Sequence, residues 1–145
     1  MIKKLLITPI KKVSNSLGNI YLLAKSKDNI NKDIKESYLT ELHPDKIKAW
    51  KNHLRHEQNL IVIHGKINLV VFDNRRKKST LKNYRIDGEK KLRLIKIPNN
   101  VWFGFHNCGK KKVQILNFIE KYHDPKEYKK LPIKNKLIPY QFKKR

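Results

Sequence analysis

The sequence is poor in cysteine and has no long hydrophobic run. Cys108 is the single cysteine among 145 residues, so no intramolecular disulfide can form. This cysteine usage fits a reducing compartment, and we expect a cytoplasmic protein. No stretch approaches the roughly 20 apolar residues of a membrane-spanning helix. The opening MIKKLLITPIKK is too short and too interrupted by charge for a signal peptide.

Acidic residues are also scarce, at 12 against 35 lysines and arginines, which gives a formal net charge of +23. Such an excess favours anionic partners, nucleic acid included. Only six of the basic residues are arginines, however, and nucleic-acid surfaces typically interleave arginine with aromatic residues. A lysine-coated surface that attracts nucleotide phosphates is therefore the main interpretation, and nucleic-acid binding is an alternative supported by charge alone.

Strand signals dominate a chain whose length suits a single hydrophobic core. Short runs rich in β-branched and aromatic residues and bounded by Gly, Asn, Asp or Pro predict strands. These runs are residues 19–24, 37–42, 47–50, 60–63, 66–72, 92–97 and 113–118. Their spacing predicts an all-β antiparallel sandwich or small barrel, with at most one or two short helices, mainly near the C-terminus.

Turn residues divide the chain further. Gly65, in Ile63-His64-Gly65-Lys66, occupies a hairpin position that requires a positive φ, and Pro98 ends the strand before it. Residues 26–36 predict a polar loop or a short helix. We expect one domain over residues 1–128 and a basic C-terminal tail over residues 129–145.

A polar segment, KNHLRHEQ at residues 51–58, follows the third predicted strand. Because strand side chains alternate, Lys51 and His53 share one face, as do Ile47 and Ala49. If this face is the interior, both polar side chains lie in a cavity. If the strand instead ends near Trp50, both are in solvent.

The chain contains two motifs, and the first begins in this segment. The first has the pattern H-x-H, then Glu, then a glycine turn, at Lys51, His53, Glu57 and Gly65. The second has the pattern P-x-G-x-x-H-x-x-x-N, at Pro98, Asn100, Phe103 and Asn107. In outline the chain resembles a cupin, which implies a jelly-roll β-barrel.

Lys51 and Phe103 stand where that family has metal-binding histidines. A metal site needs three or four ligands, and only His53 and Glu57 remain at matching positions. His56 is a nearby substitute that does not match. The resemblance therefore implies neither a metal nor another cofactor.

A narrower resemblance covers most of the chain. Its pieces are Gly65, Asp73, Arg75, Thr80, Ile97-Pro98, Val101-Trp102, Gly104-Phe105, Tyr122 and Asp124-Pro125. They are similar to the sugar-nucleotide cupins of the dTDP-4-dehydrorhamnose 3,5-epimerase type and to the related nucleotide-sugar 3,4-ketoisomerases. The resemblance implies a homodimer that binds a nucleotide-diphospho sugar and acts as an isomerase or epimerase in surface polysaccharide biosynthesis.

The departures concern the catalytic groups. The 3,5-epimerases use a histidine, a lysine and a tyrosine, and the corresponding places here hold Lys51, Gln58, and Leu116 or Asn117. The usual double-epimerase machinery is therefore absent. His53 matches the second histidine of the ketoisomerase motif and is the candidate base, with Lys51 as a second base or as the group that stabilises an enolate.

The candidate catalytic residues are thus Lys51 and His53. The candidate substrate-binding residues are Gln58, Glu57, Arg75, Phe103, Asn117 and Tyr122. Some of these residues have a structural alternative: Tyr122 could anchor the tail, and Arg75 could lie in a solvated loop. Trp50 and Trp102 could stack on a ligand, but they are better explained as core residues. For the whole chain, a non-catalytic sugar-nucleotide-binding cupin is the alternative to an enzyme.

Overall fold

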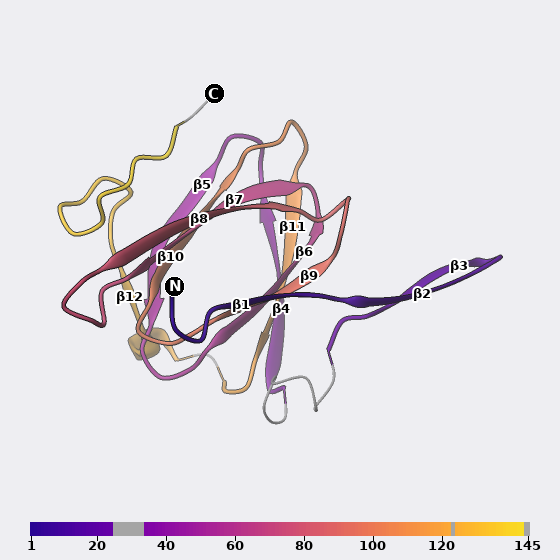
Figure 1. Cartoon of the computed structure of the whole chain (residues 1–145), viewed down its shortest axis with the longest axis horizontal. Coiled ribbons are helices and arrows are strands. Elements are labelled where there is room, and N and C mark those ends of the chain that lie inside the picture. The colour runs from indigo at the N-terminus through magenta and orange to yellow at the C-terminus, as the bar shows by residue number, and fades with distance from the viewer. Residues whose placement is uncertain (25–33, 123, 144–145) are drawn as a thin grey trace.

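Two five-stranded antiparallel sheets lie face to face in the computed structural model, which describes residues 1–24, 34–122 and 124–143 (Figure 1). The first sheet has the order β1 (Leu6–Pro9), β9 (Arg93–Ile97), β6 (Gln58–His64), β11 (Val113–Ile119) and β4 (Glu36–Leu42). The second has the order β12 (Tyr128–Lys130), β5 (Ile47–His53), β10 (Trp102–Asn107), β7 (Lys66–Asp73) and β8 (Thr80–Asp87). The predicted all-β jelly roll is confirmed, as two facing sheets and not one continuously closed barrel.

The main core lies between the two sheets. Its buried side chains come from alternate positions of the central strands, as a period of two requires. They include Leu60, Val62, Ile95, Ile97 and Ile115 of the first sheet and Ile67, Leu69, Val71, Phe103 and Phe105 of the second. On β6 the intervening Ile61 packs in a separate cluster, which explains why this strand is apolar on both faces.

A β-bulge between β5 and β10 sets the direction of the polar side chains. Phe103 pairs with Lys51 but Phe105 pairs with Lys48, so β5 has one more residue than β10 across this interval. A bulge shifts the alternation of the strand that contains it. As a result Ala49 packs in the cluster around Trp50, and the prediction that Ala49 shares the face of Lys51 and His53 is wrong.

Strand bounds differ from the predicted ones in detail. β5 continues to His53, so the alternative in which this strand ends near Trp50 is wrong. The strand predicted at residues 19–24 is β3 (Gly18–Leu22). The predicted positive φ of Gly65 is confirmed at 79°, and β9 ends at Ile97, directly before Pro98. Most of the loop predicted at residues 26–36 lies outside the described residues.

Five strands were not predicted: β1, β8, β10, β12 and β2 (Lys11–Asn15). β2 pairs with β3 as a hairpin that extends away from the two sheets (Figure 1). Leu17 is 96% exposed and Ile20 is 65% exposed, so this hairpin presents apolar side chains to solvent.

The C-terminal tail covers the outer face of the second sheet. Ile138 is buried there against Trp50, Val70, Phe72 and Trp102. Leu131, Tyr140 and Phe142 pack around the same cluster, and the Trp50 indole N–H donates to the Ile133 carbonyl at 3.2 Å. Both tryptophans are therefore core residues.

In the described part of the chain the only helical element is the single turn Pro125–Glu127, and no helix has the length and apolar character needed to cross a membrane.

Candidate active site

A cavity of about 250 Å³ opens between the two sheets at the end of β5. It continues inward as a narrower pocket of about 60 Å³ whose walls include Leu60, Phe103, Phe105 and Ile115. Six residues line both parts: Thr40, Lys48, Lys51, His53, Gln58 and Asn117. The inner end is thus apolar and the outer end carries cations, an imidazole and amides, which is the usual composition of a small-molecule site.

The bulge places Lys48 beside Lys51 in the cavity wall. Lys51 is half-buried, and its Nζ lies 5.1 Å from the centre of the Tyr128 ring. Burial, together with repulsion by Lys48 and Lys130, holds the pKa of the Lys51 ammonium below its usual range. Burial and Lys130 act in the same direction on the pKa of Lys48. An anion in the cavity would relieve this repulsion.

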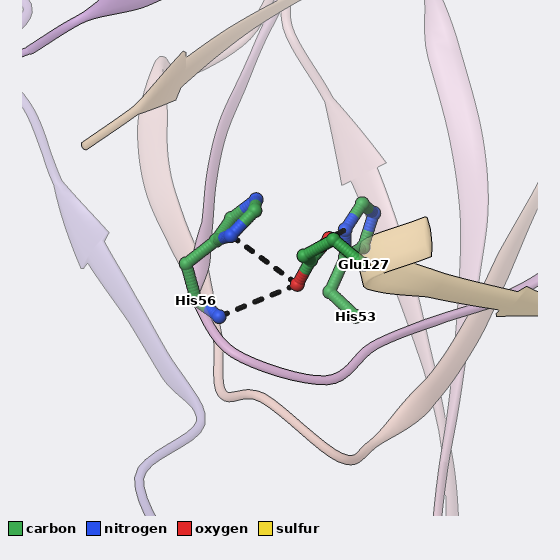
Figure 2. Close-up of side chains that lie close together, drawn as sticks. All are labelled: His53, His56 and Glu127. Carbon is green, nitrogen blue, oxygen red and sulfur yellow. Dashed lines mark hydrogen bonds and ion pairs between the residues drawn. The ribbon is translucent and has the colours of Figure 1, made fainter. Parts of the chain in front are cut away.

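His53 is oriented by a carboxylate. Its Nδ1 lies 2.7 Å from Glu127 Oε2, a hydrogen bond between two largely buried groups (Figure 2). Because an ionised carboxylate only accepts, Nδ1 carries the proton and donates it, which leaves Nε2 with a lone pair. The ring also stacks on Phe103, at 6.1 Å between centroids. This arrangement fixes both the tautomer and the ring plane.

Glu127 is held in place by local structure. Asp124 caps the helical turn by accepting from the Lys126 N–H at 2.9 Å, and Pro125 occupies its first position. The turn brings the Glu127 carboxylate to the loop after β5, where Oε1 accepts the Arg55 N–H at 3.0 Å. The Leu54 N–H also donates to the Glu127 carbonyl at 2.9 Å. The carboxylate is therefore a fixed partner for His53.

The two members of the pair have pKa values suited to a neutral imidazole beside an ionised carboxylate. Burial lowers the pKa of His53 below its usual range, with His56 and Lys51 acting in the same direction and Glu127 opposing them. Burial acts to raise the pKa of Glu127, but hydrogen bonds from the Arg55 backbone and His53 prevail and keep it below its usual range. A neutral, oriented imidazole can accept a proton at Nε2.

Two amides complete the polar wall. The Asn117 side-chain N–H donates to Gln58 Oε1 at 2.8 Å, across β6 and β11. Asn117 Oδ1 is buried without a hydrogen-bond partner among the described residues. Such an acceptor is available to a hydroxyl group of a bound ligand.

Five of the eight candidate residues line this cavity: Lys51, His53, Gln58, Phe103 and Asn117. The other three do not line it. Glu57 forms an ion pair with Lys96 at 2.6 Å. Arg75 binds both carboxylate oxygens of Asp73 and the carbonyl of Lys3. Tyr122 is 70% exposed on the surface.

Several residues that line the site were not among the candidates, and those with a titratable side chain next to His53 or Lys51 include Lys48, His56, Glu127 and Tyr128. Glu127 is 74 residues from His53 in the sequence, and neither motif contains it. The Asp124-Pro125 pair that precedes it matches the sugar-nucleotide cupins. Because Asp followed by Pro is a common start of a helical turn, this pair is the signal in the sequence for an ordered segment here.

Most of the chain matches a known protein family. The family model described as "FdtA: WxcM-like, C-terminal" matches residues 3–134. Among curated proteins, the probable low-salt glycan biosynthesis epimerase Agl13 of Haloferax volcanii is 28% identical over 107 residues. The alignment covers 69% of this chain and 68% of that relative.

Solved structures share the fold. A dTDP sugar isomerase from Desulfovibrio desulfuricans G20 superposes with a TM-score of 0.87 at 24% identity, covering 96% of this chain and 90% of that one. QdtA, a sugar 3,4-ketoisomerase from Thermoanaerobacterium thermosaccharolyticum solved in complex with TDP, has a TM-score of 0.72 at 19% identity, with 88% of each chain covered. The cupin fold and the resemblance to sugar-nucleotide cupins are therefore confirmed.

Proposed function

Because this chain belongs to the FdtA family of WxcM-like C-terminal domains, we propose that it is an isomerase acting on a nucleotide-diphospho sugar that carries a ketone. The observation that carries the proposal is the His53–Glu127 pair at the wall of a cavity between the two sheets. The cavity of about 250 Å³ suits a sugar ring, with the nucleotide at its mouth. There the lysines attract the diphosphate.

The reaction we assign is a shift of the ketone between neighbouring carbons. His53 Nε2 removes the proton from the hydroxyl-bearing carbon beside the ketone, and the electron pair moves to the ketone oxygen to form an enediolate. The same imidazole, now protonated, returns the proton to the former ketone carbon while the hydroxyl proton passes to the other oxygen. No oxidant or reductant is consumed, because one carbon is oxidised as its neighbour is reduced.

Lys51 is assigned to the developing oxyanion. As a cation in a partly buried site it stabilises negative charge on the enediolate oxygens more than it stabilises the neutral ketone. Asn117 Oδ1 and the Gln58 amide are placed to bind sugar hydroxyls. Glu127 stays ionised, orients His53 and stabilises the transient imidazolium.

Deuterium exchange tests this assignment. With TDP-4-keto-6-deoxyglucose, the ligand of a related ketoisomerase structure, in heavy water, we expect by NMR a 3-keto product with isotope at C4 and recovered 4-keto substrate with isotope at C3. We expect no double epimerisation at C3 and C5, because its histidine, lysine and tyrosine are replaced, and loss of one positioned base costs on the order of 10²–10⁴ in rate. Exchange at C5 at a rate similar to C3 would contradict the proposal.

A non-catalytic binding cupin is the second candidate. Replacement of the first-motif histidine by Lys51 and of the second-motif histidine by Phe103 favours it. This alternative predicts saturable binding of the sugar nucleotide with no isotope incorporation at any carbon.

We also propose that two copies form a homodimer through the β2–β3 hairpin. One face of this hairpin presents Val13 and Ile20, which are register partners and are 50% and 65% exposed. β4, an edge strand of the first sheet, has Tyr38 and Leu39 at the cavity mouth. Apolar edges of this kind are commonly covered by a second subunit. A partner hairpin on β4 would complete that mouth.

Light scattering checks the assembly. We expect twice the chain mass of 17.3 kDa at micromolar concentration. Ile20→Asp should shift the protein toward the single-chain mass, because it places a charge in the contact. Lys12→Asp, on the opposite face of the hairpin, is the control and should remain dimeric. A single-chain mass for the unmodified protein would refute the dimer.

A further inference from the structure

Three metal-ligating side chains converge at the mouth of the cavity. His53, His56 and Glu127 each offer a ligand atom, and these atoms lie within 4.8 Å of one another. The Glu127 carboxylate lies between the two imidazoles (Figure 2). Its Oε2 is 2.7 Å from His53 Nδ1, and its Oε1 is 3.2 Å from His56 Nδ1.

His56 supplies a second, independent observation. The residue is only 8% exposed, and its Nδ1 has no hydrogen-bond partner among the described residues, although it lies 3.2 Å from Glu127 Oε1 as an ion-pair contact. Buried polar atoms in native proteins are nearly always satisfied, and one that is not calls for an unseen partner. The fold therefore leaves a buried imidazole nitrogen that makes no hydrogen bond beside the carboxylate that His53 also contacts.

We propose that His53 Nδ1, His56 Nδ1 and the Glu127 carboxylate bind one divalent transition-metal ion, with Zn²⁺ as the best match. Two histidines and one glutamate form an established donor set for zinc, with the fourth position left to water or a ligand. Zinc–ligand bonds of about 2.0–2.1 Å in a tetrahedral site place neighbouring donors about 3.3 Å apart. The 3.2 Å from His56 Nδ1 to Glu127 Oε1 already matches, and the 2.7 Å from His53 Nδ1 to Glu127 Oε2 would open by about 0.6 Å when the ion replaces the shared proton. The two imidazole nitrogens, which lie within 4.8 Å of each other, would rotate toward the shared ion.

The surroundings of the three donors also suit a metal. All three line the cavity, so a fourth ligand can enter from solvent. The Arg55 and His56 N–H groups donate to Glu127 Oε1 at 3.0 and 3.4 Å and so orient the carboxylate, as outer-shell donors do in metal sites. The nearby cation Lys51 lies over the Tyr128 ring, whose π face interacts favourably with its charge.

This site does not depend on the proposed isomerase activity, since a chain without turnover could bind the ion equally well. It has a consequence for that activity. A metal on His53 Nδ1 replaces the hydrogen bond to Glu127 that orients the imidazole, so Zn²⁺ should inhibit the isomerase.

The test is a titration of metal-free full-length protein with Zn²⁺ by calorimetry, repeated with Co²⁺ to follow the visible absorption of a tetrahedral site. We expect one ion per chain and a tetrahedral cobalt spectrum. His56→Ala and Glu127→Gln should each weaken binding by at least the 10- to 100-fold that loss of an outer-shell partner causes. His64→Ala is the control, because this histidine is the last residue of β6 and is not one of the three donors, and it should bind as the unmodified protein does.

Two results would overturn the site: absence of stoichiometric binding by the unmodified protein, or equal affinity in the His56→Ala, Glu127→Gln and His64→Ala variants. Circular dichroism shows whether each variant is folded. Lys51→Met adds a test that does not remove a ligand, because loss of the neighbouring positive charge should strengthen metal binding. Weaker binding in this variant would also contradict the site.

Discussion

Replacing His53 with asparagine should lower the rate of ketone isomerisation by about 10²- to 10⁴-fold, the usual contribution of a positioned general base. Asparagine keeps a polar side chain that can still donate to Glu127, but it has no lone pair that accepts a proton near neutral pH. The affinity for the nucleotide diphosphate should change little, because the lysines that would hold it remain. Single-turnover kinetics and calorimetry with TDP separate the two effects.

The matched control for this variant is His64→Asn. His64 is the last residue of β6, where its side chain is 43% exposed and 3.6 Å from Glu89, and the substitution should leave the rate unchanged. Full activity in His53→Asn would show that the base is another residue. Lys51→Met would then be the variant that abolishes proton exchange.

Deleting residues 131–145 should remove most of the stability of the fold. The deletion would expose Trp50, Trp102 and Phe72, which are now 1%, 6% and 3% exposed. It also removes two hydrogen bonds between the backbones of Trp50 and Leu131. Burial of one large apolar side chain contributes about 1.5–3 kcal/mol. The loss is therefore of the order of the whole 5–15 kcal/mol that typically separates the folded and unfolded states.

Urea denaturation followed by tryptophan fluorescence measures this effect. Deletion of residues 143–145 alone is the control, because it leaves Ile138, Tyr140 and Phe142 in place, and it should unfold at the same urea concentration as the full chain. If the long deletion yields no folded protein, Ile138→Ala gives a graded result, with an expected loss of about 2–5 kcal/mol. An unchanged urea midpoint in the deletion of residues 131–145 or in Ile138→Ala would contradict the role of the tail.

Much of the fold follows from patterns that single strands carry themselves. β6 and β7 are apolar runs joined by a glycine turn, so their positions were predictable. β8 has the sequence TLKNYRID, in which most residues are polar or charged. This composition is also typical of a loop. β10 contains Gly104, a residue that usually weakens a strand. Here a Cβ at this position would lie 2.4 Å from the Ala49 Cβ, so glycine allows the close approach of β10 to β5.

Strand alternation made part of the candidate site predictable. The residues that reach the cavity only through tertiary contacts were not predictable. Alternation predicted that Lys51 and His53 share a face, and both line the cavity. Lys48 joins them because of the bulge, which depends on pairing with β10. Glu127 contacts His53 from a capped turn far along the chain, and no local sequence pattern predicts that these two residues meet. The expectation of no metal site rests on the cupin motif positions and on the mismatch of His56, and Glu127 belongs to neither motif.

A crystal structure with TDP-4-keto-6-deoxyglucose bound to the His53→Asn variant tests the central claim most directly. The account predicts the sugar ring inside the cavity between the two sheets, with its C3 about 3–3.5 Å from the position of the His53 Nε2 when the imidazole is superposed. It also predicts the diphosphate beside Lys48 and Lys51. A sugar nucleotide bound outside this cavity, or one whose ketone and C3 face away from residue 53, would contradict it.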